Sequence, residues 1–81
     1  MDWKHRIVRD LLIAEGTPIL RGTRVPLKTV LASLAEGAST AAILADFPTL
    51  TELDVRAAVA FAAASAQEDL PYVSMPGGVK I

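Results

Sequence analysis

Three helix-like apolar segments, separated by one glycine and one proline, constrain the fold of this chain most. The first starts after Pro26, which suits a first helical turn. Its apolar residues recur at i, i+3, i+4 and i+7, the pattern of one helix face: Leu27, Val30, Leu31 and Leu34. Gly37 can end this helix. Ser39 can cap a second helix, which ends near Phe47 because Pro48 pushes its predecessor out of the helical region.

The third segment has the strongest start signal in the chain. Thr51 and Asp54 stand at the N-cap and N3 positions of a capping box in which Asp replaces Glu, and Leu50 and Val55 occupy the positions of a hydrophobic staple. The helix that follows is apolar nearly all round through about residue 67, so we expect burial on more than one side. In so small a domain this favours a partner subunit, with dimer contacts at Val59, Phe61 and Ala63.

The residues before the first helix predict short strands joined by tight turns. Over residues 6–25, two β-type runs alternate with turns that contain Gly16 and Gly22, and glycine permits a positive φ in such turns. We expect Gly22 to adopt that conformation, Thr23 to cap the turn, and Arg24 to pair with a carboxylate such as Asp46. The alternative is that Arg24 contacts a nucleic acid or a partner.

The predicted fold class is therefore mainly α: a three-helix helix-turn-helix core with short N-terminal β strands and an extended C-terminal tail. The second and third helices, joined by residues 48–50, have helix-turn-helix spacing, although many small α domains contain such a corner. With 81 residues the chain forms one domain, expected at residues 1–70. Residues 71–81 contain two prolines and two adjacent glycines, which favour an extended tail without a core of its own.

The composition argues against an enzyme. There is no cysteine, which excludes disulfides and thiolate metal sites, and the single histidine, His5, cannot form a triad or a two-histidine metal site within one chain. The glycine spacings match no phosphate loop. We expect no metal, no cofactor and no catalytic residue. No apolar run approaches the ~20 residues of a membrane span, and no signal peptide is recognisable, so we expect a cytoplasmic protein without membrane contact.

The charge is divided between the two ends of the chain. The net charge is −1, but residues 1–28 hold six basic and three acidic residues, whereas residues 29–81 hold two basic and six acidic ones. The basic end predicts phosphate contacts, although the same residues are compatible with an ordinary solvated surface. The acidic start of the third helix, with Glu52 and Asp54, is unsuited to reading bases. The candidate DNA-binding residues are Arg6, Arg9, Arg21, Arg24, Lys28 and Arg56.

Several separated motifs resemble those of the family known as domain of unknown function 433. A glycine, a proline, an apolar pair and Gly-Thr-Arg are followed in order by three further stretches, so that the similarity covers roughly residues 5–66: Gly16–Pro26, Leu34–Ser39, Ile43–Thr51 and Asp54–Ala58. The chain departs from the family pattern at Thr17, where Lys is common. It also departs at Leu11 and Leu12, which replace an Asp-Pro-like turn, so the first loop is expected to differ in shape.

The resemblance implies a winged-helix-like or helix-turn-helix domain and a link to antitoxins that pair with PIN-type ribonuclease toxins. Our first hypothesis is an antitoxin-like transcription regulator of a toxin-antitoxin system, which forms a homodimer, binds operator DNA and neutralises such a toxin. The alternative is a protein-interaction module without DNA binding.

The tail is the expected partner-binding segment. Its apolar residues in an extended strip suit strand addition to a toxin or to the other subunit, and its lysine can reach a carboxylate cluster of a metal nuclease. The alternative is that the tail packs on its own domain. The candidate partner-binding residues are Tyr72, Val73, Met75, Lys80 and Ile81.

Overall fold

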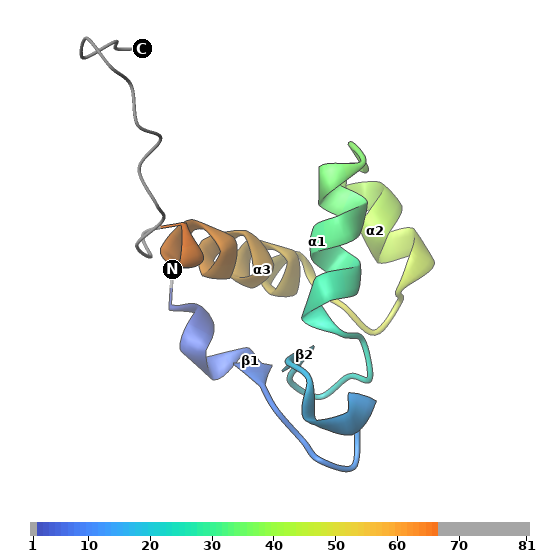
Figure 1. The fold of residues 1–81 in the computed structure, drawn as a ribbon. Coiled ribbons are helices and arrows are strands. Elements are labelled where there is room, and N and C mark those ends of the chain that lie inside the picture. Colours follow the sequence, from blue (N-terminus) through green and yellow to red (C-terminus); the bar gives the residue numbers. More distant parts are fainter. Residues whose placement is uncertain (1, 67–81) are drawn as a thin grey trace, which may run out of the picture.

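The computed structural model describes residues 2–66, which form three α-helices and a small β element that lies below the helices in the view of Figure 1. In chain order the elements are the 3₁₀ helix η1 (Trp3–His5), strand β1 (Ile7–Val8), the 3₁₀ helix η2 (Ala14–Gly16), strand β2 (Ile19–Leu20), and the helices α1 (Leu27–Ala35), α2 (Thr40–Asp46) and α3 (Glu52–Ser65). The predicted fold class is confirmed over these residues.

The β element is centred on β2. Strand β1 pairs with it antiparallel, with Ile7 opposite Leu20 and Val8 opposite Ile19. On the other side of β2, the segment that leads into α1 returns antiparallel, because the amide of Leu20 donates to the carbonyl of Val25 (3.1 Å) and the amide of Leu27 donates to that of residue 18 (2.9 Å). The predicted short strands are thus confirmed, each two residues long.

The predicted caps position the helix-turn-helix pair α2–α3. The side chain of Ser39 accepts a hydrogen bond from the amide of Ala42, and Thr51 and Asp54 form both bonds of the capping box. Between them, the chain turns at Phe47, whose φ and ψ leave the helical region. Because the caps satisfy amides that have no partner inside a helix, they define where α2 and α3 begin.

One hydrophobic core joins the three helices to β2. Its most buried members are one residue from β2, two from α1, one from α2 and three from the turn and the first half of α3: Leu20, Leu27, Val30, Ile43, Leu50, Val55 and Ala58. Burial within α3 ends there, since the side chains after Phe61 are exposed. The expectation of burial on several sides therefore holds only for the first half of this helix.

The described residues end before the tail. Helix α3 closes at Ser65 with Ala66 as its C-cap, close to the predicted end. The boundary at residue 70, the tail over residues 71–81 and the partner-binding residues predicted there lie outside the described residues. Within residues 2–66, no helix combines the length and the apolar character that crossing a membrane requires.

Candidate functional site

A rigid turn between β2 and α1 carries two of the candidate arginines. The hydroxyl of Thr23 donates to the carbonyl of Leu20 (2.7 Å) and accepts from the amide of Val25 (3.0 Å), and Gly22 has a φ of +81°. The predicted roles of Gly22 and Thr23 are confirmed. The buried hydroxyl of Thr23 thus stabilises the backbone of the turn. Arg21 and Arg24, which the turn carries, are both exposed.

Arg24 does not pair with Asp46, so that expectation is wrong. The ion pairs among residues 2–66 are His5–Asp2, Arg6–Asp54 and Arg56–Glu52. The turn needs no carboxylate to hold it, since Thr23 already bonds both of its ends. The guanidinium of Arg24 is therefore available for a ligand.

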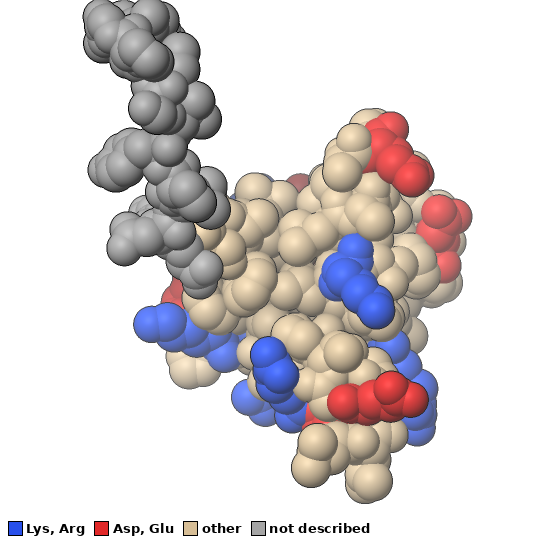
Figure 2. Space-filling model, viewed as in Figure 1, with Lys and Arg blue, Asp and Glu red and all other residues tan. Residues whose placement is uncertain are grey.

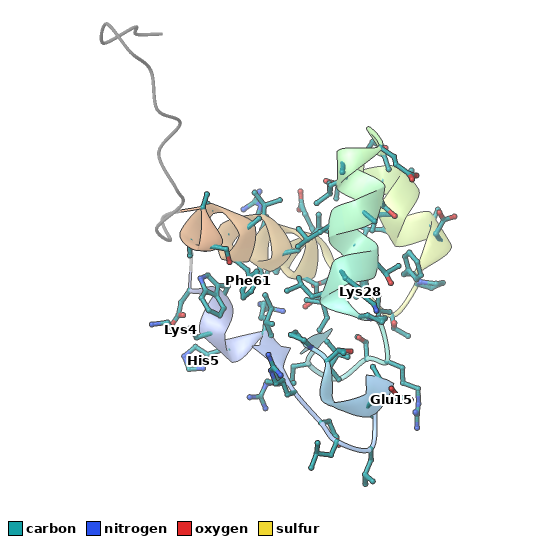
Figure 3. The ribbon with its side chains drawn as sticks, in the orientation of Figure 1. Lys4, His5, Glu15, Lys28 and Phe61 are labelled. Carbon is teal, nitrogen blue, oxygen red and sulfur yellow. The ribbon has the colours of Figure 1, made fainter. Side chains whose placement is uncertain are left out.

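Arg21 is oriented by the N-terminal segment. Its backbone amide donates to the carbonyl of Arg6 (2.7 Å), and its side-chain Nε donates to the carbonyl of His5 (2.8 Å). The side-chain bond uses Nε and not the two terminal nitrogens of the guanidinium, and a guanidinium can bind a phosphate or carboxylate through its terminal nitrogens. His5 itself points away from α3, as Figure 3 shows, and its side chain is exposed.

Arg21 and Arg24 line an open groove together with Arg9, which we call the arginine groove. Its volume is about 1040 Å³. Most of its remaining surface is apolar and comes from β1, the loop after it, β2, the turn before α1 and the α2–α3 turn: Val8, Ile13, Ile19, Val25, Pro26 and Phe47. Among the described residues, Asp10 is the one acidic side chain in the lining, and its Oδ1 accepts from the amide of Leu12 (2.9 Å). The groove thus combines a cationic rim with an apolar floor.

The other three candidate DNA-binding residues lie elsewhere. Arg6 pairs with the buried carboxylate of Asp54 at 3.2 Å, so its charge is used inside the fold. Arg56 lies 3.8 Å from Glu52 on the exposed side of α3. Lys28 projects from the start of α1 (Figure 3), where it borders a separate small apolar cleft. The structure therefore brings together three of the six predicted residues.

The surface charges follow the division seen in the sequence. In Figure 2, most blue side chains lie over the N-terminal elements in the lower half of the view, together with the red side chain of Glu15, and the ends of α1 and α2 carry red ones. The acidic residues at those ends are Glu36 and Asp46, both exposed. A polyanion would accordingly approach from the side of the β element.

The predicted dimer residues do not form one surface. Val59 is 50 % exposed and Ala63 is exposed, and at four residues' spacing they share a helix face. Phe61 lies on the opposite side of α3, where its ring meets that of Trp3 edge to face, with centroids 5.0 Å apart and an interplanar angle of 82°. Figure 3 shows Phe61 facing η1, so a contact within the chain occupies it.

Sequence reasoning missed one exposed apolar feature next to the groove. Leu11 and Leu12 are 85 % and 90 % exposed at the tip of a turn closed by a bridge between Asp10 and Ile13. The departure from the family pattern at these two positions was the available signal. Two leucines with neither helical nor strand spacing have no core position to occupy, so the tip presents them to solvent.

The fold and the groove define a small, mainly α protein. Its groove is lined by the β element and by the turn of the helix-turn-helix pair, and the rim of the groove is cationic. The model for the family described as "Protein of unknown function (DUF433)" matches residues 7–62, and the chain belongs to this family. The match contains every element that forms the arginine groove.

A solved structure supports the same assignment. The chain is similar to a DUF433 member protein from Anabaena variabilis ATCC 29413, with a TM-score of 0.69 and 28% sequence identity. The similarity covers 79% of this chain and 63% of that one, so the chain spans less than two thirds of its neighbour's length. No curated protein matches the sequence.

Proposed function

We propose that this chain is a non-enzymatic, antitoxin-like regulator that binds DNA phosphates through the arginine groove and neutralises a PIN-type ribonuclease as a dimer. The observation that carries the proposal is the convergence of Arg9, Arg21 and Arg24 around one groove. Guanidinium groups bind phosphates through two parallel hydrogen bonds, and a fixed backbone at the turn lowers the entropy lost on binding.

The proposal includes recognition mainly of the sugar-phosphate backbone of DNA rather than of its bases. Helix α3, which follows the turn of the helix-turn-helix pair, begins with the exposed carboxylate of Glu52, and Arg56 lies beside that carboxylate. A carboxylate at this position repels phosphates, and bases are read mostly by Arg, Lys, Asn and Gln. We therefore expect modest sequence specificity and a strong dependence on salt.

The antitoxin part of the proposal rests on the family and on α3. The family resemblance implies PIN-type toxins as partners, and the outer half of α3 offers the exposed apolar surface that a partner or second copy needs. The competing proposal is a protein-interaction module without DNA binding. It is favoured by the apolar floor of the groove, which phosphates do not use, and by the exposed Leu11 and Leu12.

Fluorescence anisotropy separates the DNA-binding regulator from the interaction module. It uses a labelled DNA duplex from the promoter region of the protein's own gene and is recorded between about 50 and 200 mM salt. Arg9→Gln with Arg24→Gln removes two groove charges, whereas Lys4→Gln with Lys28→Gln removes two charges outside the groove. Each phosphate contact contributes about 0.9 to the slope of log K against log salt. We expect the groove variant to lose about 1.8 from that slope and the control variant to resemble the native chain.

Equal losses in both double variants would show a diffuse electrostatic effect and contradict the groove assignment. Absence of salt-dependent binding by the native chain would leave the interaction module as the function. Circular dichroism of each variant confirms that the fold is intact, since none of the four side chains is buried.

A further inference from the structure

The arginine groove has a chemistry that DNA uses only in part. Its rim holds three guanidinium groups, but its floor is formed by aliphatic and aromatic side chains such as Ile19, Val25 and Phe47. A ligand that fits both the rim and the floor is an extended chain in which carboxylates are followed closely by apolar side chains. Peptides of this kind combine charge pairing at the rim with apolar burial in the floor.

The chain carries such a segment directly after α3. Residues 68–73 read Glu-Asp-Leu-Pro-Tyr-Val, two carboxylates followed by four apolar or aromatic residues. Pro71 disfavours a helical conformation for Leu70 and favours an extended one. The segment lies outside the described residues. Its acidic residues complement the positive charge of the rim, and its apolar residues complement the apolar floor.

The acidic residues of this segment do not reach the groove of their own chain. Helix α3 has 14 residues, which corresponds to about 21 Å, and Phe47 and Thr49 line the groove just before the helix starts. Glu68 stands two residues beyond Ala66, which is about 7 Å of extended chain. A chain of that length can return over at most about a third of α3, which is too short to bring the carboxylate of Glu68 to this side of its own groove.

A second copy removes this difficulty. The exposed residues of the outer half of α3 include four at i, i+3, i+4 and i+7, which form one apolar face: Val59, Ala62, Ala63 and Ala66. In an antiparallel pair joined by these faces, Ala66 of one copy lies beside Val59 of the other. From there the second copy's α3 start is seven residues or about 10 Å away, a distance that about three extended residues span.

We propose that residues 68–73 of one copy occupy the arginine groove of a second copy, in a dimer paired through the outer faces of α3. Asp69 is the first residue whose backbone reaches the start of the second copy's α3, and its carboxylate pairs with the long arginine side chains of the rim. Glu68 adds negative charge beside it, and the residues after Asp69 cover the floor. In this arrangement the tail and DNA compete for the same groove, so the test of the dimer contains no DNA, and either proposal can fail without the other.

A charge exchange between two full-length variants tests the assignment. The groove variant carries Arg9→Glu and Arg24→Glu, and the tail variant carries Glu68→Lys and Asp69→Lys. Alone, each places like charges at the contact, and we expect sedimentation equilibrium to give a dimer dissociation constant at least about tenfold higher than that of the native chain. Mixed in equal amounts, the two variants are complementary in both contacts and should recover a heterodimer of near-native affinity.

Three results would overturn the proposal. The first is unchanged dimerisation in both single variants. The second is recovery only when all four substitutions are in one chain and none on mixing, which would place the tail in its own groove. The third is a native chain that stays monomeric at high micromolar concentration. Lys28→Glu and Glu36→Lys, exposed charges outside the groove, serve as matched controls.

A second measurement locates the contact without relying on affinity. The chain has no cysteine, so Thr49→Cys and Val73→Cys each introduce one thiol. Under mild oxidation, a mixture of the two variants should form a mixed disulfide faster than Val73→Cys mixed with Glu36→Cys. Equal rates in the two mixtures would contradict docking in the groove.

Discussion

Gly22 sets the direction of the turn that carries Arg21 and Arg24. Its φ of +81° is in the left-handed region, and a Cβ built there meets no atom within 4 Å. Replacement by alanine therefore tests backbone strain without a steric clash. We expect Gly22→Ala to lower the free energy of unfolding by roughly 1–2 kcal/mol. Gly22→Asn should cost less, because Asn tolerates this region. Urea titration measures both, and equal stability of all three chains would contradict the role given to the turn.

Asp54 combines three roles in one buried side chain. It is 5 % exposed, completes the capping box by accepting from the amide and hydroxyl of Thr51, and receives Arg6 at 3.2 Å. Asp54→Ala removes one of the two bonds of the capping box and leaves Arg6 and the amide of Thr51 without their carboxylate partner, so we expect a loss of about 3 kcal/mol in unfolding free energy. Glu52→Ala, an exposed acid in the same helical turn, should change it by under about 0.5 kcal/mol. A similar loss in both would refute this difference.

Of the contacts of Asp54, the sequence predicted those made with residues close by in the chain. Thr51 and Asp54 are three residues apart, so their capping box follows from spacing. The link to Arg6 crosses 48 residues, and no periodicity pairs side chains over that distance. The error for Arg24 has the same origin, because its expected pairing with Asp46 depended on tertiary proximity.

The short helix η1 is held against α3 by Trp3. Its ring meets that of Phe61 at a centroid distance of 5.0 Å, and aromatic pairs of this kind contribute about 0.5–1.5 kcal/mol beyond burial. Because Trp3 is the one tryptophan of the chain, its fluorescence reports this contact. We expect Phe61→Ala to shift the emission to longer wavelength and to lower stability by about 2 kcal/mol. Leu12→Ala, at an exposed position, should leave both unchanged, and an unshifted spectrum for Phe61→Ala would contradict the contact.

The outer half of α3 provides the prediction about dimer formation. Val59 and Ala63 are both exposed and share one helix face, so Val59→Glu with Ala63→Glu should add repulsion only between copies. We expect a chain with native helical content that light scattering shows as a monomer where the native chain is dimeric. Glu substitution at Ala35 and Ala42, exposed on other helices, is the matched control. A dimer that survives the first pair would place the contact elsewhere.

Elements were predictable where the apolar pattern was regular. The apolar periods of the first and third helices predicted α1 and α3 close to their observed bounds. The capping serine and the following proline did the same for α2. The pattern of α3 did not reveal that burial stops near Phe61, because alanine is compatible with both a core and a surface. The turn at Ala14 and Glu15, where φ is +53° and +57°, was not anticipated, because neither residue type favours a positive φ.

At the scale of the whole molecule, the helices and the core found within the described residues 2–66 all lie before the tail. All three helices end by Ser65, and the core residues come from positions 20–58. We therefore expect deletion of residues 71–81 to leave the ellipticity at 222 nm and the unfolding midpoint nearly unchanged, while dimerisation weakens by at least about tenfold because the residues proposed for the groove floor are lost. Unfolding of the truncated chain would show that the tail belongs to the core.

The contact between Arg6 and Asp54 has a further consequence for how this domain opens. Arg6 precedes β1 directly, and Asp54 closes the first turn of α3, so the strand cannot detach without exposing the carboxylate that caps the helix. The β turn and the helix-turn-helix pair therefore belong to one cooperative unit rather than to two foldons. In native-state hydrogen exchange, the amides of Leu20 and Val55 should open with the same free energy. A ligand bound at the turn would then protect α3 without contacting it.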